Sequence, residues 1–300
     1  HHHHEENNLQ GKKLIIVTLF NFSITVVQFI GGIFSNSLSL ISDAIHNLGD
    51  TSALFIAFLA GKHSQKQATA ENTFGYKRTE ILAALFNAVV LIGICIYLFF
   101  EAYNRFLHPE PIKGKIMLIV AIFGLLANAI SVIVLHKDKT HNLNIKAAYM
   151  HLLGDTLSSI AVIIGGIAIW IWNIYWIDPL ITVLVSIYII YHTYSIVKET
   201  TNILMQGAPS GIDIIRIKND IESIENIENI HHLHIWQLFE NQIHFEAHIT
   251  LKENISLDKV DTLRNNIEKL LLDKFNINHS TLQIGYNCCD IAEPLLHTHS

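Results

Sequence analysis

Apolar residues form long, nearly uninterrupted runs over the first two-thirds of the chain. A helix needs about 20 mostly apolar residues to cross the hydrocarbon core of a bilayer. Runs of that kind are separated here by polar or charged segments, and the first two by a turn at Ser35-Asn36-Ser37. The pattern therefore predicts six membrane-spanning helices, over residues 14–34, 38–60, 81–100, 116–135, 145–177 and 179–197.

The last third of the chain follows shorter periods, in which apolar positions recur at helical spacing or alternate as in strands. It predicts, in chain order, a helix, two strands, a second helix and a third strand, over residues 213–227, 232–239, 242–251, 257–275 and 280–286. Glu240-Asn241 supplies the turn of a hairpin between the first two strands. The α-β-β-α-β order is typical of a small, ferredoxin-like α+β domain.

Four parts of the chain are expected from these patterns: a His-rich N-terminal tail (1–11), a six-helix transmembrane domain (12–206), a cytoplasmic α+β domain (207–287) and a C-terminal tail (288–300). His1–His4 are followed by two glutamates, and two interpretations of this tail stay open. It is either a segment that gathers metal for the membrane domain, as His-rich tracts do, or the remnant of a purification tag.

The composition agrees with a membrane protein: 50% of the residues are hydrophobic and 15% are charged, against about a quarter charged in soluble domains. The net charge of −6 argues against nucleic acid as a partner, because phosphate binding needs a basic surface. Cys95, Cys288 and Cys289 are too few for a disulfide framework, so nothing in the sequence requires an oxidising compartment.

Lysine and arginine next to the predicted spans indicate the orientation, since cytoplasmic loops carry an excess of both. The side that bears both chain ends holds most of them: Lys12, Lys13, Lys62, Lys66, Lys77, Arg78, Lys137, Lys139, Lys146 and Lys198. Both termini are therefore expected in the cytoplasm, and an even number of spans agrees with this because it places the two ends on the same side.

Two predicted spans carry the same motif, His-x-x-x-Asp, as His46 with Asp50 and His151 with Asp155. A spacing of four places both side chains of a pair on one helical face. Ionisable groups inside a bilayer are costly and indicate a functional site by default. If the two faces meet, two imidazoles and two carboxylates form a tetrahedral set that suits Zn²⁺ better than Mg²⁺ or Ca²⁺. The alternative, a His–Asp contact that only pins the bundle, is less favoured because the motif occurs twice.

Asp43 and Asn47 lie on the same face as Asp50. We expect them to pack between helices or to orient His46 by hydrogen bonding, rather than to bind metal directly. Glu80 follows Lys77 and Arg78 at the start of the third span, and we expect an ion pair there rather than a metal ligand.

Charge balance favours a transport site over a structural one. Two carboxylates and two neutral imidazoles that hold Zn²⁺ sum to zero, and so do the same groups with both imidazoles protonated. The site can therefore stay neutral while it exchanges one metal ion for as many as two protons.

Three segments carry a family resemblance: SLSLISDAIHNLGD at 37–50, FGYKRTE at 74–80 and NLNIKAAYMHLLGD at 142–155. They resemble the cation diffusion facilitator family, and its bacterial zinc, cobalt and cadmium efflux branch in particular. The segments His234-Ile-Trp and Leu282-Gln283 fit the cytoplasmic domain of that family. The likeness extends over residues 12–287.

The resemblance implies a homodimer of six-helix protomers in a bacterial inner membrane, which exports Zn²⁺, Cd²⁺ or Co²⁺ against protons by alternating access. It implies a transport site made of His46, Asp50, His151 and Asp155. It also implies a cytoplasmic domain that helps dimerisation and senses metal, with Zn²⁺ as transported substrate and as regulator.

The sequence departs from the family pattern at two positions. Asn72 stands where many relatives have a histidine in the loop after the second span, and Gly285 stands where an acidic ligand is common. The cytoplasmic ligand candidates are therefore a tentative set, in which two thiolates replace the missing carboxylate: His234, His248, Asp261, Cys288 and Cys289. The alternative is a group of solvated histidines on a strand face beside a loose tail.

Two other functions compete with transport. One is a membrane sensor or receptor that binds zinc without conducting it. The other is an intramembrane metalloprotease, an enzyme whose signature His-Glu-x-x-His does not occur in the sequence.

Overall fold

The computed structural model describes residues 2–136, 143–239, 242–286 and 295; within these ranges the side chains of 2–18, 54, 57–58 and 134–153 are not described. The described chain falls into two units. The first consists of His1–Leu59 and Ala83–Val197, and the second of Ala60–Leu82 and Lys198–Ser300.

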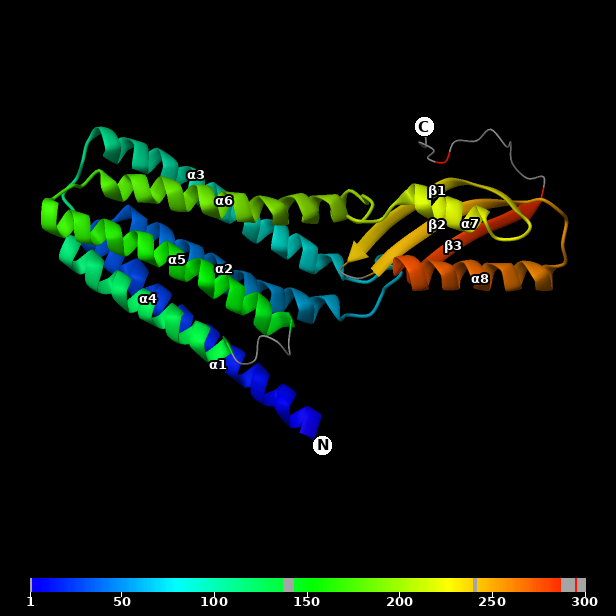
Figure 1. Cartoon of the computed structure of the whole chain (residues 1–300), viewed down its shortest axis with the longest axis horizontal. Coiled ribbons are helices and arrows are strands. Elements are labelled where there is room, and N and C mark those ends of the chain that lie inside the picture. The colour runs from blue at the N-terminus through cyan, green and yellow to red at the C-terminus, as the bar shows by residue number, and fades with distance from the viewer. Residues whose placement is uncertain (1, 137–142, 240–241, 287–294, 296–300) are drawn as a thin grey trace. The chain divides into compact units, whose positions relative to one another are not determined.

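Six helices precede the α+β part, as the apolar runs predict: α1 (His2–Ser35), α2 (Leu38–Ser64), α3 (Arg78–Leu107), α4 (Gly114–His136), α5 (Leu143–Trp172) and α6 (Ile177–Leu204). α4 packs extensively against α1 and α5, and Figure 1 shows it alongside both. Four described stretches are long and apolar enough to cross a membrane, in α3, α4, α5 and α6. The described apolar part of α1, Leu19–Ser35, is shorter.

Several helix ends differ from the prediction, and α3 and α6 continue to Leu107 and Leu204, beyond the predicted 100 and 197. α1 begins at His2 rather than near residue 14, because no proline interrupts the polar residues that precede the apolar run and the helix accommodates Gly11. α5 ends at Trp172 rather than near residue 177, because Asn173 takes a left-handed conformation with φ of 54° and terminates the helix.

A buried aspartate from α6 caps the start of α2. Asp178 is fully buried, and its carboxylate accepts hydrogen bonds from the backbone N–H groups of Leu38 and Ser39 at 2.7 and 3.2 Å. The hydroxyls of Ser37 and Ser39 also donate to it, both at 2.6 Å. A negative charge satisfies the free N–H groups of the first turn and interacts favourably with the helix dipole. This contact holds the beginning of the helix that carries His46 and Asp50.

The second unit contains α7 (Ile214–Glu222), β1 (Ile227–Phe239), β2 (Gln242–Leu251), α8 (Leu257–Phe275) and β3 (His279–Tyr286). The strands form one sheet in the order β1-β2-β3, with β1 and β2 antiparallel and β2 and β3 parallel (Figure 1). The predicted α-β-β-α-β order is thereby confirmed. The predicted hairpin turn at Glu240-Asn241 lies outside the described residues.

One face of this sheet is apolar and packs against the two helices. Phe245, Ala247 and Ile249 of β2 are buried together with apolar residues of α7 and α8, namely Ile217, Ile221, Leu263, Ile267 and Leu271. β1 begins at Ile227, earlier than predicted, because a register shift between His231 and His234 breaks the alternation on which the prediction rests. His232 has a φ of 52° at this irregularity.

Candidate metal centre

Three of the four predicted membrane ligands come together in the first unit. One ligand atom from each of His46, Asp50 and Asp155 lies within 4.8 Å of the others. His46 Nδ1 is 3.4 Å from Asp50 Oδ2, and His46 Nε2 is 3.5 Å from Asp155 Oδ1. His46 and Asp155 are buried, whereas Asp50 is half-buried. The spacing of four within α2 accounts for the first contact, and the packing of α5 against α2 for the second.

His151, the fourth predicted ligand, belongs to α5 and lies one turn before Asp155. Its side chain is outside the part of the chain that the structure describes. Its membership in the site therefore stays a prediction.

The spacing of the donor atoms suits a small divalent cation. Two ligand atoms bound tetrahedrally at about 2.0–2.1 Å from Zn²⁺ are roughly 3.3 Å apart. The two measured nitrogen–oxygen distances, 3.4 and 3.5 Å, are each close to that separation, but they involve opposite nitrogens of the His46 ring. One ion binds one of these nitrogens, so only one of the two distances can be a separation between ligands of the same ion. The same distances also let a protonated imidazole interact with both carboxylates, since only the charged ring has two N–H donors.

Asp43 joins three helices instead of entering this group. Its carboxylate accepts hydrogen bonds from Gln28 Nε2 of α1 at 3.0 Å and from Ser158 Oγ and Ser159 Oγ of α5 at 2.6 and 3.3 Å. It is buried, one turn before His46. These bonds hold α2 against α5 at the level of the metal ligands. The described contact of Asn47 is through its backbone carbonyl, which accepts from Thr51 Oγ1 at 3.0 Å, so the role predicted for its side chain stays open.

The sequence analysis missed Tyr188 of α6 as a neighbour of the site. Its ring meets the His46 ring edge to face, with centroids 6.4 Å apart. Its hydroxyl oxygen lies 2.7 Å from the place that a Cβ on Gly154 would occupy. The glycine directly before Asp155 could have indicated a close approach at this position. No local sequence pattern identifies Tyr188 as the residue that approaches it.

The tentative cytoplasmic ligands are only partly described. His234 and His248 both lie near the ring of His232, with centroid distances of 5.0 and 4.5 Å, and His231 lies 5.5 Å from His248. Asp261 of α8 is half-exposed and pairs with Arg264 at 3.3 Å. Cys288 and Cys289 lie outside the described residues.

Among the described side chains, the His46 group is the one set of three or more metal-ligating residues whose ligand atoms approach within 4.8 Å. The described part of the cytoplasmic unit therefore does not assemble a third ligand around His234 and His248. A complete cytoplasmic site stays a prediction that depends on the tail.

The expectation for Glu80 is wrong. Its carboxylate accepts a hydrogen bond from the hydroxyl of Ser64. In the described structure it forms no ion pair with Lys77 or Arg78, because Lys77 Nζ lies over the Phe239 ring, 5.5 Å from its centroid, and Arg78 extends into a cavity.

Two protein-family models match the chain. Residues 14–205 match the cation efflux transmembrane domain, and residues 209–285 match the cytoplasmic domain of cation efflux proteins.

Bacterial relatives match over nearly the whole chain. The metal cation efflux system protein CzcD of Cupriavidus metallidurans is 34% identical over 91% of this chain and 85% of its own length. The zinc transporter ZitB of Yersinia pestis is 39% identical over 93% of this chain and 89% of its own. A Bacillus velezensis protein named cadmium, cobalt and zinc/H(+)-K(+) antiporter is 36% identical over 91% and 88%.

Proposed function

Because the chain belongs to the cation efflux (cation diffusion facilitator) family, in its bacterial zinc, cobalt and cadmium branch, we propose that it exports Zn²⁺ from the cytoplasm in exchange for external protons. The ion passes through a tetrahedral site within the membrane domain. Its ligands are His46, Asp50, His151 and Asp155.

The observation that carries this proposal is the position of His46 between two carboxylates from different helices. A neutral imidazole offers a lone pair to a metal ion, whereas the protonated ring donates to both carboxylates. Metal and protons therefore compete for the same group of atoms, which is the requirement for exchange. The names of the relatives, a zinc transporter and a zinc/H(+)-K(+) antiporter, support the same function.

The ligand chemistry indicates which metal ions the site accepts. Two nitrogen and two oxygen donors in a tetrahedral arrangement suit Zn²⁺, and Cd²⁺ and Co²⁺ are accepted by the same set. We infer a homodimer with both termini in the cytoplasm of a bacterial inner membrane, supported by the match of residues 209–285 and by the bacterial relatives. Protons are the coupling ion, and the protein acts as a secondary transporter rather than as an enzyme.

Zinc flux in proteoliposomes with an imposed proton gradient tests the proposal. His46→Ala is expected to abolish gradient-driven flux, because it removes the group that lies between the two carboxylates. His63→Ala is the matched control, since His63 belongs to the same helix but contacts Tyr76 in the second unit. Flux at the rate of the unmodified protein in His46→Ala would contradict the proposal. Zinc binding without any flux in the unmodified protein would favour the membrane sensor.

A further inference from the structure

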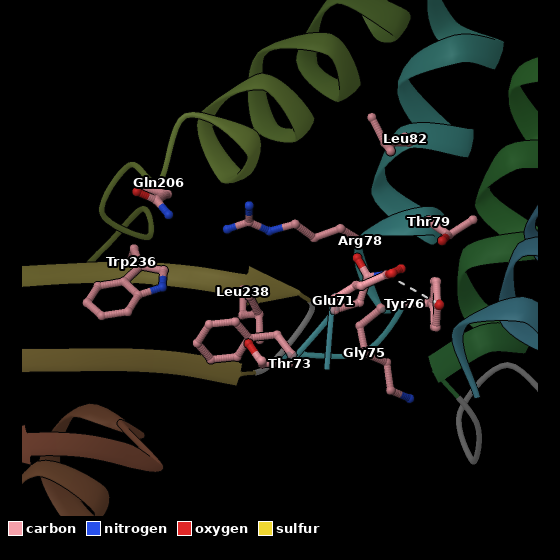
Figure 2. A pocket seen from close by; sticks show the side chains of 13 residues that line it. Glu71, Thr73, Gly75, Tyr76, Arg78, Thr79, Leu82, Gln206, Trp236 and Leu238 are labelled. Carbon is pink, nitrogen blue, oxygen red and sulfur yellow. Dashed lines mark hydrogen bonds between the residues drawn. The ribbon is translucent and has the colours of Figure 1, made fainter. Parts of the chain in front are cut away.

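A cavity of about 430 Å³ lies within the second unit, apart from the metal centre. The loop between α2 and α3 and the first turn of α3 form one wall, and the end of β1 with the residue Gln206 forms the other. Figure 2 shows the Arg78 side chain extending from the start of α3 into the space between Gln206, Trp236 and Leu238.

Arg78 lacks the partner that a partly buried guanidinium needs. Its Nε is inaccessible to solvent and has no hydrogen-bond partner, and the described residues form no ion pair with it. An unsatisfied charged donor that is buried is costly, whereas a planar guanidinium binds a phosphate with two parallel hydrogen bonds. Its position in the cavity therefore indicates an anion.

The surroundings of Arg78 add positive potential. Lys77 also lines the cavity, and its contact with the Phe239 ring leaves its charge uncompensated by any described carboxylate. Both residues lie at the N-terminus of the 30-residue helix α3, where the helix dipole is positive. Glu71 is the one acidic side chain among the lining residues, and it is exposed.

The opposite wall is apolar. Trp236 and Leu238 of β1 lie across the cavity from the start of α3, whereas Leu82 lines the cavity from α3 itself. The cavity thus combines a cationic side with an apolar side. Arg78 is also the first residue of a helix long enough to cross a membrane, and the ends of such helices lie near phospholipid headgroups.

We propose that this cavity binds a phosphate ester through Arg78 and Lys77, with the uncharged part of the ligand against Trp236 and Leu238. Two sources share this chemistry: the headgroup of an anionic phospholipid and a soluble phosphate ester. The described features place a phosphate in the cavity in either case.

The test uses native mass spectrometry of the full-length protein in an uncharged detergent. One arm titrates dioleoylphosphatidylglycerol, with dioleoylglycerol as the lipid without phosphate. The other arm titrates glycerol 3-phosphate. The unmodified protein is compared with Arg78→Gln, and with Lys66→Gln as the matched control, because Lys66 is an exposed lysine of the same loop that does not line the cavity.

Arg78→Gln is expected to bind the phosphate probe about tenfold or more weakly, as the loss of charge-assisted hydrogen bonds implies, while Lys66→Gln binds as the unmodified protein does. Preference for the phosphatidyl lipid identifies the membrane as the source, and binding of glycerol 3-phosphate identifies a soluble ester. If Arg78→Gln folds poorly, Lys77→Gln carries the comparison, with a smaller loss expected. The absence of binding in both arms, or an equal loss in Arg78→Gln and Lys66→Gln, would overturn the proposal.

Discussion

His46 lies at the centre of the proposed metal site, because each nitrogen of its ring is close to one carboxylate. Asp50 is one turn away on the same helix, whereas Asp155 comes from α5. Removing the charge of either carboxylate weakens the binding of the metal ion. It also weakens the stabilisation of the protonated imidazole that takes the place of the ion. The buried member of the pair, Asp155, experiences the lower dielectric constant, so its charge is the more important of the two.

Asp155→Asn is therefore expected to reduce the affinity for Zn²⁺ by about tenfold or more, since an amide keeps the size of the side chain but not its charge. Titration calorimetry with the full-length protein measures the effect. Asp258→Asn, an exposed residue in the first turn of α8, is the control and leaves the affinity unchanged. Equal affinities for Asp155→Asn and the unmodified protein would remove Asp155 from the site.

Gly154 and Tyr188 provide a second prediction at the level of the residue. A methyl group on Gly154 would lie 2.7 Å from the Tyr188 hydroxyl oxygen, so Gly154→Ala must displace the ring that packs on His46. We expect it to lower zinc flux and to destabilise the protein by about 1–3 kcal/mol, as overpacking does.

Gly93→Ala is the matched control, because it is also a glycine within a helix and nothing lies within 4 Å of its added methyl group. Adding Tyr188→Phe to Gly154→Ala removes the clashing oxygen and is expected to restore flux. Failure of this second substitution to restore any flux would show that the close approach to the hydroxyl is not the cause.

At the level of the element, the start of α2 depends on a cap from another helix. Asp178 accepts four hydrogen bonds from Ser37, Leu38 and Ser39, and it is completely buried. An ordinary N-cap comes from the residue next to the helix and contributes about 1 kcal/mol. The cap of α2 also joins α6 to the α1–α2 turn, so its loss affects three helices at once.

Asp178→Asn is expected to destabilise the membrane unit by about 2 kcal/mol or more. The NH₂ group of the amide would face N–H and O–H donors, where the aspartate carboxylate has an oxygen that accepts from them. Denaturant unfolding of the full chain measures this change. Asp213→Ala removes the exposed cap of α7 and is expected to lower the free energy of unfolding by only about 1 kcal/mol. If Asp178→Asn lowered the free energy of unfolding less than Asp213→Ala does, the cap that Asp178 places on α2 would not have the importance inferred here.

The stability of the β2–β3 pair is expected to depend on pH. Burial lowers the pKa of His244 below its ordinary value of 6.5, and the neighbouring charge of His279 lowers it further. Their rings are 4.5 Å apart, and Trp236 stacks on the other side of His244. Because the unfolded state then binds more protons than the folded state, stability is complete above the unfolded pKa and is lost as the pH falls below it.

Hydrogen exchange of the β2 amides in the full chain is therefore expected to accelerate as the pH is lowered through the region of pH 6.5, after correction for the intrinsic exchange rate. His244→Gln removes this contribution and flattens the profile. His108→Gln, on an exposed histidine after α3, leaves the profile as it is. An unchanged slope in His244→Gln would exclude this histidine as the source.

At the level of the whole molecule, the ligands and their supporting contacts belong to one unit. His46, Asp50, Asp155, Asp43 and Asp178 all lie in the membrane unit, whereas the candidate phosphate cavity lies in the other. Ligands at the two places therefore have separate local effects, since each stabilises the unit that binds it.

Zinc at about 100 times its dissociation constant is expected to stabilise α2 and α5 by up to about 2.7 kcal/mol, because the ion binds only the folded unit. Hydrogen exchange of these two helices, with and without a chelator, measures the protection. In His46→Ala the protection should disappear from α2 and α5, whatever happens in β1 and β2. Equal protection in this variant would place the bound ion elsewhere.

The sequence alone determined the features that depend on neighbouring residues. The six helices follow from apolar runs long enough to cross a bilayer. The α-β-β-α-β order and the adjacency of His46 and Asp50 follow from helical and strand periods, which the backbone geometry converts directly into a face of a helix or strand. The left-handed conformation of Asn173 and the early start of β1 were not predicted from the sequence, because a single residue ends or distorts each element.

Only the tertiary structure decided which distant side chains meet. The approach of Asp155 to His46, the cap that Asp178 places on α2 and the packing of Tyr188 over Gly154 join residues on separate helices. Arg78 could have paired with Glu80 by sequence distance, yet it points into a cavity while Glu80 accepts from Ser64. Such contacts depend on the rotation and depth at which helices and loops pack, and a local pattern of apolar and polar residues specifies neither.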